Sequence, residues 1–184
     1  MSDTENAFRR AAFLLGSARF MTLATVSPAG EPWASTVNYV PMEDASIRVV
    51  WYSMRDARHS RNIESNARAT ASIFRTNLTH ESPLGLDGLQ LEGTCRAIPA
   101  DELAVFHEHY YARNFVDDAA RHEWMLPLDD FRGDGKRRFY ELTVERLWLL
   151  DIDRWLIDKH DQRVAVPSLA SVADALRRTG GQVK

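Results

Sequence analysis

The sequence is poor in cysteine and carries no strong excess of charge. Cys95 is the only cysteine among 184 residues, so no internal disulfide can form. A chain without disulfides fits a reducing compartment and is expected to be cytoplasmic. The net charge of −3 argues against a nucleic-acid partner or an anionic membrane surface, because both usually require a broad basic face.

Long apolar runs and several common catalytic motifs are also missing. No run approaches the roughly 18 apolar residues of a membrane-spanning helix, and "MSDTENAFRR" lacks the apolar core of a signal peptide. The sequence contains no G-x-S-x-G, P-loop or G-x-G-x-x-G pattern. It therefore gives no support to a hydrolase of that type, a P-loop kinase or a Rossmann enzyme, and it predicts no membrane partner.

Apolar and β-branched segments with short turns between them predict a mainly β protein. The expected strands are at 20–26, 32–40, 47–53, 69–74, 89–98 and 137–152. The expected helices are at 5–18, 57–65, about 99–125 and about 168–178. Asp56 is expected to cap the second helix, Asn66 to end it in a left-handed conformation, and Pro99 to open the third.

This pattern predicts one domain over residues 1–184, a small antiparallel barrel with peripheral helices. The helices at about 99–125 form an insertion, and the one at about 168–178 is C-terminal. The strand "FMTLATV" (20–26) is apolar on both faces. It therefore needs cover from the barrel interior on one side and from helices or a second subunit on the other.

The stretch "WYSMRDARHSRNI" (51–63) concentrates positive charge where a strand gives way to a helix. Arg55, Arg58, His59 and Arg61 lie within seven positions. Unpaired backbone N–H groups and the helix dipole make such a helix start a natural binding site for anions, phosphate included. A solvated helix face that happens to carry arginines explains the same residues.

The order of the surrounding segments resembles the FMN-binding split-barrel family that includes pyridoxamine 5′-phosphate oxidase. A "P-x-G-x-P" hairpin turn at 28–32 precedes a strand, and "ARHSRNI" (57–63) resembles the family's "S-R-K-x-x-N-L" helix start. The strand "LQLEGTCRAI" (89–98) then follows with its glycine. The resemblance covers about residues 10–98 and implies an antiparallel split barrel that binds FMN at a homodimer interface.

The resemblance also implies which residues bind the cofactor. Arg58 and His59, then Arg61 and the Ser53 hydroxyl, are the expected phosphate partners. Backbone groups along the second strand would meet the pyrimidine side of the ring, and the third strand would border it. Gln90 matches a position that reaches the flavin from the partner subunit. The complete expected set is Ser35, Thr36, Val37, Asn38, Trp51, Tyr52, Ser53, Arg58, His59, Arg61 and Gln90.

Two departures from the family pattern affect the expected chemistry. His59 stands where relatives have lysine, and Ala57 where they have serine. A histidine titrates near pH 6.5, so FMN affinity is expected to fall between pH 6 and pH 8. In addition, "VERLWLLDIDRWLIDKHDQRV" does not match the C-terminal arginine–histidine segment that binds substrate phosphate in true pyridoxamine-phosphate oxidases, so vitamin B6 synthesis is not predicted.

The function predicted from these observations is an FMN-dependent oxidoreductase that exchanges reducing equivalents with a small molecule or a reduced nicotinamide. No side chain is assigned as catalytic, and no metal site is predicted. Two alternatives remain. The same fold could hold a deazaflavin, or a haem with a ligand among His107, His109 and His122. A non-catalytic binding module for oligonucleotides would show salt-sensitive binding.

Overall fold

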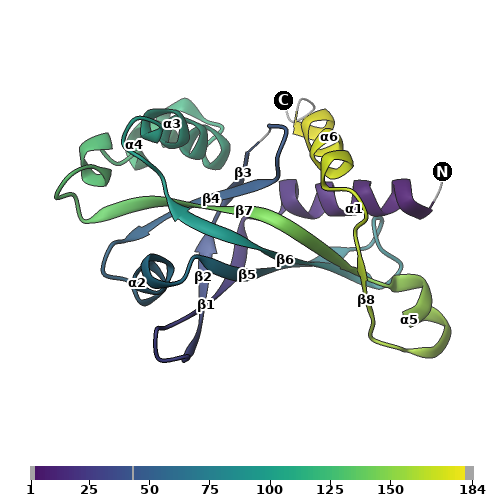
Figure 1. The fold of residues 1–184 in the computed structure, drawn as a ribbon. Helices are drawn as coiled ribbons and strands as arrows, with labels where there is room; N and C mark the ends of the chain where they lie inside the picture. The colour runs from purple at the N-terminus through teal and green to yellow at the C-terminus, as the bar shows by residue number, and fades with distance from the viewer. Residues whose placement is uncertain (1–2, 43, 181–184) are drawn as a thin grey trace.

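The computed structural model describes residues 3–42 and 44–180. Within these residues, eight strands form a single antiparallel sheet (Figure 1). The strands are β1 (Phe20–Val26), β2 (Pro32–Asn38), β3 (Val40–Pro41), β4 (Arg48–Met54), β5 (Arg68–Leu78), β6 (Gly85–Ala97), β7 (Arg137–Leu150) and β8 (Arg163–Ala165). Their order is β2-β1-β5-β6-β7-β4-β3, with β8 beside β7, which confirms the predicted antiparallel β architecture.

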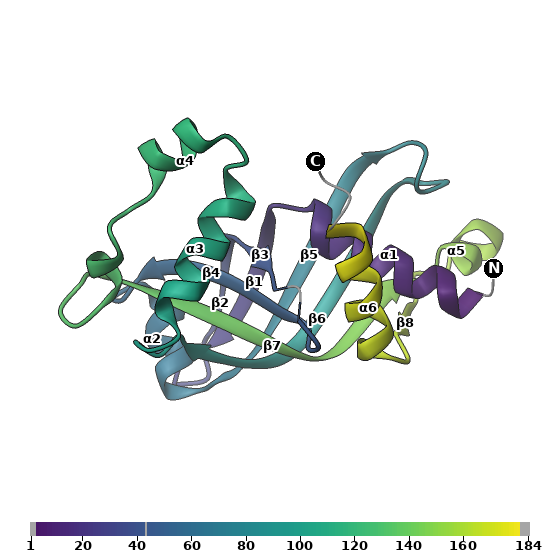
Figure 2. The same ribbon diagram turned by 90° about the horizontal axis from the view of Figure 1, so that it is seen from above.

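Helices lie around this sheet. They are α1 (Asp3–Ser17), α2 (Arg58–Ser65), α3 (Leu103–Asn114), α4 (Asp118–Trp124), the 3-10 helix η1 (Leu128–Phe131), α5 (Ile152–Asp158) and α6 (Leu169–Gly180). The two views show α1 and α6 side by side at one end, with α3 over β4 and β7 at the other (Figures 1 and 2). No helix in the described ranges is long and apolar enough to cross a bilayer.

Two hydrophobic clusters hold these layers together. The larger one fills the inner side of the sheet under α1 and α6, where Leu15, Leu23 and Trp51 are fully buried. The smaller one is rich in aromatic residues and lies under α3, where Tyr111 and Phe139 are buried. Burying such large side chains stabilises the fold by about 1.5–3 kcal/mol each.

The outer face of β1 has no cover from the residues that the structure describes. Met21 and Leu23 point into the core, whereas Phe20 remains 56% exposed on the other face. The neighbouring strand β5 exposes Phe74 to 58% on the same sheet. The described residues therefore cover one face of this two-sided strand and leave apolar side chains exposed on the other.

The structure corrects several predicted boundaries. The strand expected at 32–40 is divided after Asn38, because Tyr39 turns inward and its hydroxyl donates to the Leu15 carbonyl at 2.9 Å. Ala57, not Asp56, precedes α2, and no side chain caps that helix. Asn66 is extended at φ −144° rather than left-handed. Helix α3 begins at Leu103, later than Pro99.

The β5–β6 hairpin is longer than the sequence pattern predicts. Pairing continues from Ser72 opposite Gln90 out to Leu78 opposite Gly85, through residues rich in turn formers. Cross-strand hydrogen bonds keep this extension in register despite its weak strand propensity. Helix α5, η1 and β8 were not predicted, because each is too short to show a clear hydrophobic period.

Gly93 has a specific reason to be glycine. It sits at an irregularity between β6 and β7, and a Cβ at this position would lie 1.9 Å from the Thr143 carbonyl oxygen. Only a residue without a side chain allows the two backbones to come this close. The glycine of the "LQLEGTCRAI" segment therefore serves strand packing.

Candidate cofactor site

The start of α2 brings Arg58 against the β1–β2 hairpin. The Arg58 guanidinium donates to the Glu31 carboxylate at 2.7 Å and lies over the Trp33 ring, 4.6 Å from its centroid. Both partners come from the turn and the first residues of β2. This arrangement places a cation beside the unpaired N–H groups of a helix start, as anion binding requires. Glu31 and Trp33 were not predicted as site residues, because nothing local in the sequence links them to Arg58.

His59, the second residue of α2, faces inward rather than toward solvent. It is only 7% exposed, and its Nδ1 is hydrogen-bonded to the Ser35 hydroxyl of β2 at 3.0 Å. Its buried Nε2 has no partner among the described residues. Burial lowers the pKa of His59 below its usual value of 6.5, so the imidazole of the free chain is neutral at pH 7. A buried, unpaired ring nitrogen beside a helix start is an open hydrogen-bonding position.

Other polar residues fix α2 to the sheet. Asn62 donates from Nδ2 to the Thr25 hydroxyl of β1 at 3.0 Å, and both side chains are buried. The Ser60 hydroxyl donates to the Met54 carbonyl at the end of β4 at 2.8 Å. These bonds set the angle at which the first turn of α2 meets β2. Arg61 points to the exposed side of the helix and forms no ion pair within the described part of the chain.

The four predicted residues of β2 have different surroundings. Ser35 contacts His59, whereas Thr36 is exposed on the opposite face and Val37 is buried. Both polar atoms of the Asn38 side chain are hydrogen-bonded, because its amide nitrogen donates to the Arg19 carbonyl at 2.9 Å and its oxygen accepts from Tyr110 at 2.6 Å. Asn38 therefore connects β2 to α3, and one amide N–H and one oxygen lone pair remain for other partners.

The side chain of Trp51 is buried and that of Tyr52 is half-buried, each packed against other aromatic rings, and their place beside a flavin stays a prediction. Trp51 is fully buried and stacks on Tyr140 with ring centroids 5.9 Å apart. Tyr52 packs edge-on against Tyr110 and Phe139 in the cluster under α3. Alternating strand residues face opposite sides, so each of the two sits in a different core.

Ser53 lies near the end of β4 and is paired with Arg138 of β7. The strand register thus brings Arg138 toward the turn that precedes α2. The sequence reasoning did not select Arg138, since it lies 85 positions beyond Ser53 by number and only the β4–β7 pairing makes them neighbours. Ser35, Ser53, Arg58 and His59 are the predicted residues that the fold gathers around the start of α2.

Gln90 lies apart from this group. It is exposed in a groove of about 500 Å³ on the outer face of the sheet. The groove is lined by Thr22, Ala24, Thr70, Ala71, Ser72, Gln90, Leu91, Trp148 and Arg163. This is also the face that exposes Phe20 and Phe74. Within one chain, Gln90 is therefore not part of the site at α2, and it could join such a site only through a second subunit.

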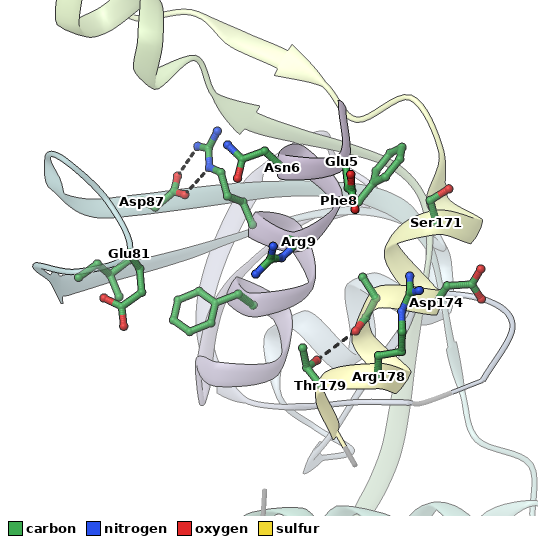
Figure 3. A pocket seen from close by; sticks show the side chains of 14 residues that line it. Glu5, Asn6, Phe8, Arg9, Glu81, Asp87, Ser171, Asp174, Arg178 and Thr179 are labelled. Carbon is green, nitrogen blue, oxygen red and sulfur yellow. Dashed lines mark hydrogen bonds and ion pairs between the residues drawn. The ribbon is translucent and has the colours of Figure 1, made fainter. Parts of the chain in front are cut away.

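A larger cavity of about 660 Å³ opens between α1, α6 and the β5–β6 hairpin (Figure 3). Its strongest internal contact is the ion pair of Arg10 with Asp87, in which two nitrogens each lie 3.0 Å from a carboxylate oxygen. Phe8 and Phe13 supply apolar wall, and acidic and basic side chains are mixed around the rim. This cavity contains none of the predicted site residues.

Two of the three histidines of the helical insertion are hydrogen-bonded to the backbone, whereas His122 is exposed on α4. His107 is buried, and its Nε2 donates to the Leu126 carbonyl at 2.8 Å. His109 Nε2 donates to the Pro41 carbonyl at 2.9 Å. Both Nε2 atoms are therefore unavailable as ligands while these bonds last. No cluster of three metal-ligating side chains occurs in the described ranges, 3–42 and 44–180.

Cys95 is buried on β6, as a small hydrophobic residue would be. Burial first, and the nearby Glu141 carboxylate second, raise the pKa of its thiol to about 12. A thiol in such surroundings remains protonated and unreactive near neutral pH. The only cysteine of the chain is thus not a candidate nucleophile.

Comparison with solved structures identifies the same fold in other proteins. A heme-binding protein from Mycobacterium smegmatis aligns with a TM-score of 0.62 at 20% identity, over 97% of this chain and 61% of that one. HutZ, the heme storage protein from Vibrio cholerae, gives 0.53 at 18% identity, over 77% and 88% of the two chains. An FAD-binding protein from Mesorhizobium loti gives 0.53 at 15%, over 80% and 92%.

These identities show a shared fold only, and coverage differs between neighbours. The chain spans 61% of the Mycobacterium smegmatis protein and 55% of a protein of unknown function from Agrobacterium tumefaciens, which aligns at TM-score 0.57 and 23% identity. A comparison with curated protein sequences finds no match.

The architecture is that of an antiparallel split barrel with peripheral helices, as predicted. The family model of pyridoxamine 5′-phosphate oxidase matches residues 9–151. The chain therefore belongs to the pyridoxamine 5′-phosphate oxidase family. The matched region contains α2, β2, β4 and β6, and thus every residue of the predicted site.

The hydrogen-bond donors at the start of α2 suit the phosphate group of a flavin. The charge of the site differs in one respect from that of the family pattern. Arg58 supplies a permanent cation, the first turn of α2 supplies backbone N–H groups, and Ser53 adds a hydroxyl nearby. The orphaned, buried Nε2 of His59 offers one more hydrogen-bonding position. The difference is that His59 is neutral at pH 7 in the free chain, where the family lysine would be charged.

Proposed function

We propose that this protein is a flavin-dependent oxidoreductase that works as a homodimer. The observation that carries the proposal is the gathering of Arg58, His59 and Ser35 where α2 begins against β2. Arg58 and the first N–H groups of α2 would hold the phosphate, and His59 would hydrogen-bond it or orient Ser35. The bound flavin would supply hydride transfer, and the protein would supply position and electrostatics.

The backbone of β2 supports the placement of the ring. Because β2 is the terminal strand in the order of the described sheet, alternate backbone N–H and C=O groups along Ser35–Asn38 have no strand partner on the outer side. Such groups can hydrogen-bond the pyrimidine edge of a flavin and stabilise negative charge there. A reduced nicotinamide or a small organic molecule would then be the partner in hydride exchange.

The uncovered sheet face supports the dimer. Phe20 and Phe74 are both more than half exposed, and they flank the groove that contains Gln90. A second copy seated on this face would bury them and bring its Gln90 toward the flavin site of the first. Phe74→Glu is expected to yield a monomer in sedimentation-velocity experiments. A dimer that persists in this variant would show that the face is not the interface.

A flavin is favoured over haem because two of the three histidines of the insertion are already bonded, and the third, His122, is exposed on α4. Two of the fold neighbours bind or store heme, and haem would need an axial ligand here. His107 and His109 direct Nε2 to backbone carbonyls. A deazaflavin would use the same anion site. A cytoplasmic location, expected from the single cysteine, stays a prediction.

The visible spectrum of the purified protein tests the proposal directly. The purified protein is expected to show the absorbance bands of oxidised flavin, or to take up added FMN. Anaerobic addition of a reduced nicotinamide should bleach these bands. A Soret band would overturn the flavin assignment in favour of haem. A fluorescent deazaflavin released on denaturation would change the cofactor but keep the site. Bound FMN that no donor reduces would indicate a binding protein rather than an enzyme.

A further inference from the structure

Two arginines converge on one backbone carbonyl beside the turn that leads into α2. Arg138 of β7 donates from Nη2 to the Gly133 carbonyl, and Arg55 donates to the same oxygen at 3.3 Å. Arg138 also donates from Nη1 to the Gly135 carbonyl at 2.9 Å. Gly133 has a positive φ of 43°, which lets the loop turn its carbonyl toward both guanidinium groups.

This pair of cations lacks a matching anion. Neither Arg55 nor Arg138 forms an ion pair with a carboxylate anywhere in residues 3–42 and 44–180. Asp134 is the acidic group whose charge acts on Arg138, but it remains exposed in the loop. Carbonyl dipoles satisfy N–H donors without neutralising charge. Burial, followed by the charge of Arg55, accordingly lowers the pKa of Arg138.

The pair adjoins the proposed phosphate site. Arg138 lies opposite Ser53, and the Arg55 N–H donates to the Lys136 carbonyl at 2.9 Å. The turn of residues 54–57 then leads directly to Arg58, which faces β2 and the Trp33 ring. Cations therefore flank this turn on both sides, with Arg58 toward β2 and the Arg55–Arg138 pair toward β7.

We infer that Arg55 and Arg138 form a second anion subsite, which takes the second phosphate of a diphosphate tail when the first phosphate is held at the start of α2. This inference rests on the proposed flavin site and specifies its preferred ligand: a flavin with a diphosphate tail, such as FAD, binds more tightly than FMN. Two linked phosphates offer one anionic group to each flank of the turn, whereas a monophosphate offers only one. Each charge-assisted hydrogen bond gained in this way contributes enough to change affinity severalfold.

A purely structural role for Arg138 makes a different prediction. If Arg138 only held the loop at 133–135, glutamine could keep part of that bonding, and any loss would appear as lower stability that is equal for all ligands. An anion subsite instead changes the ratio between diphosphate and monophosphate ligands. The ratio is insensitive to general destabilisation, so it separates the two roles.

The test compares FMN and FAD binding to the purified apoprotein by flavin fluorescence, in the wild type, Arg138→Gln, Arg55→Gln and the matched control Arg154→Gln. Arg154 is an exposed arginine paired with Asp158 on α5, far from α2 (Figure 1). We expect FAD to bind the wild type at least about fivefold more tightly than FMN. Each of the two site variants should weaken FAD about tenfold and FMN less than about threefold, with no effect in the control.

Isothermal titration with inorganic pyrophosphate and phosphate, at equal ionic strength, separates this inference from the flavin proposal. Preference for pyrophosphate that disappears in Arg138→Gln supports the subsite even if neither flavin binds, in which case only the flavin assignment falls. Equal affinities for FMN and FAD in the wild type would overturn the inference while leaving the proposed function intact. If Arg138→Gln and Arg55→Gln lose affinity for FMN and for FAD by the same factor, the inference is overturned as well.

Discussion

The carboxylate of Glu31 lies 2.7 Å from the guanidinium of Arg58 and holds it over the Trp33 ring. The cation that we assign to phosphate binding is thus paired with an acidic residue of the β1–β2 hairpin in the free chain. Both partners of this ion pair are well exposed to solvent, so the pair is weak and exchangeable. A phosphate with two negative charges would compete with Glu31 for Arg58.

Removing the Arg58 charge is expected to weaken FMN binding. In Arg58→Gln, the dissociation constant should rise about tenfold or more, because a charge-assisted bond to phosphate is lost. Fluorescence quenching on titration with FMN measures this, and Arg154→Gln again serves as the control. Unchanged affinity in Arg58→Gln would remove this residue from the phosphate site.

Removing the competing carboxylate should have the opposite effect. Glu31→Gln frees Arg58 from its ion pair and should tighten FMN binding by about two- to fivefold at low salt. The gain should shrink as ionic strength rises, because exposed charges are screened. Glu123→Gln, at an exposed position of α4, is the matched control. Weaker binding in Glu31→Gln would mean that Glu31 orients Arg58 instead of competing for it.

The buried His59 predicts a pH dependence of stability. Its pKa is lowered in the folded chain, so the unfolded state takes up the proton at a higher pH than the folded state does. The stability contributed by neutral His59 is present above pH 6.5 and is lost as the pH falls through its folded pKa. Denaturant titrations at several pH values between 7 and 5 give the free energy of unfolding at each pH. Its change with pH should be smaller in His59→Gln than in the wild type. Identical slopes would contradict burial of a neutral imidazole.

The same residue shifts the pH window expected for cofactor binding. A free-chain pKa below 6.5 means that protonated His59 adds its charge to the phosphate site only in more acidic solution. FMN affinity should therefore rise as the pH is lowered below neutrality. The pH range over which the affinity changes should extend below the range of pH 6–8 expected from sequence. His59→Lys carries its charge throughout and should show a flatter profile. A wild-type profile as flat as that of the lysine variant would exclude a charged His59.

Gly93 gives a prediction about the barrel itself. Gly93→Ala places a methyl group against the Thr143 carbonyl and should destabilise the protein by about 3 kcal/mol or more, since the backbone must shift. Gly16→Ala is the control, because its added Cβ would meet only the end of the Leu176 side chain, at 3.3 Å. Its expected cost is below about 1 kcal/mol. Thermal unfolding compares the two variants, and similar costs would argue against the close contact at Gly93.

Much of the architecture follows from local sequence patterns. The β-branched and apolar residues of "FMTLATV" and the spacing of apolar residues in α1 and α6 indicate a strand and two helices before any contact is known. The turn at 27–30 agrees as well, since the Gly30 N–H donates to the Ser27 carbonyl at 2.9 Å and Gly30 has a positive φ. The predicted strand ends were wrong where pairing with a neighbouring strand extended a segment of weak strand propensity, as in β5 and β6.

The sequence by itself determined the antiparallel barrel and the cationic character of residues 55–61, because both follow from patterns of residues that are close together along the chain. Only the tertiary structure decided what those cations meet. Ser35 contacts His59 across 24 positions, Glu31 contacts Arg58 across 27, and Arg55 reaches the Gly133 carbonyl across 78. Such contacts depend on strand register and on where α2 packs, and these are set by the whole core rather than by any local pattern.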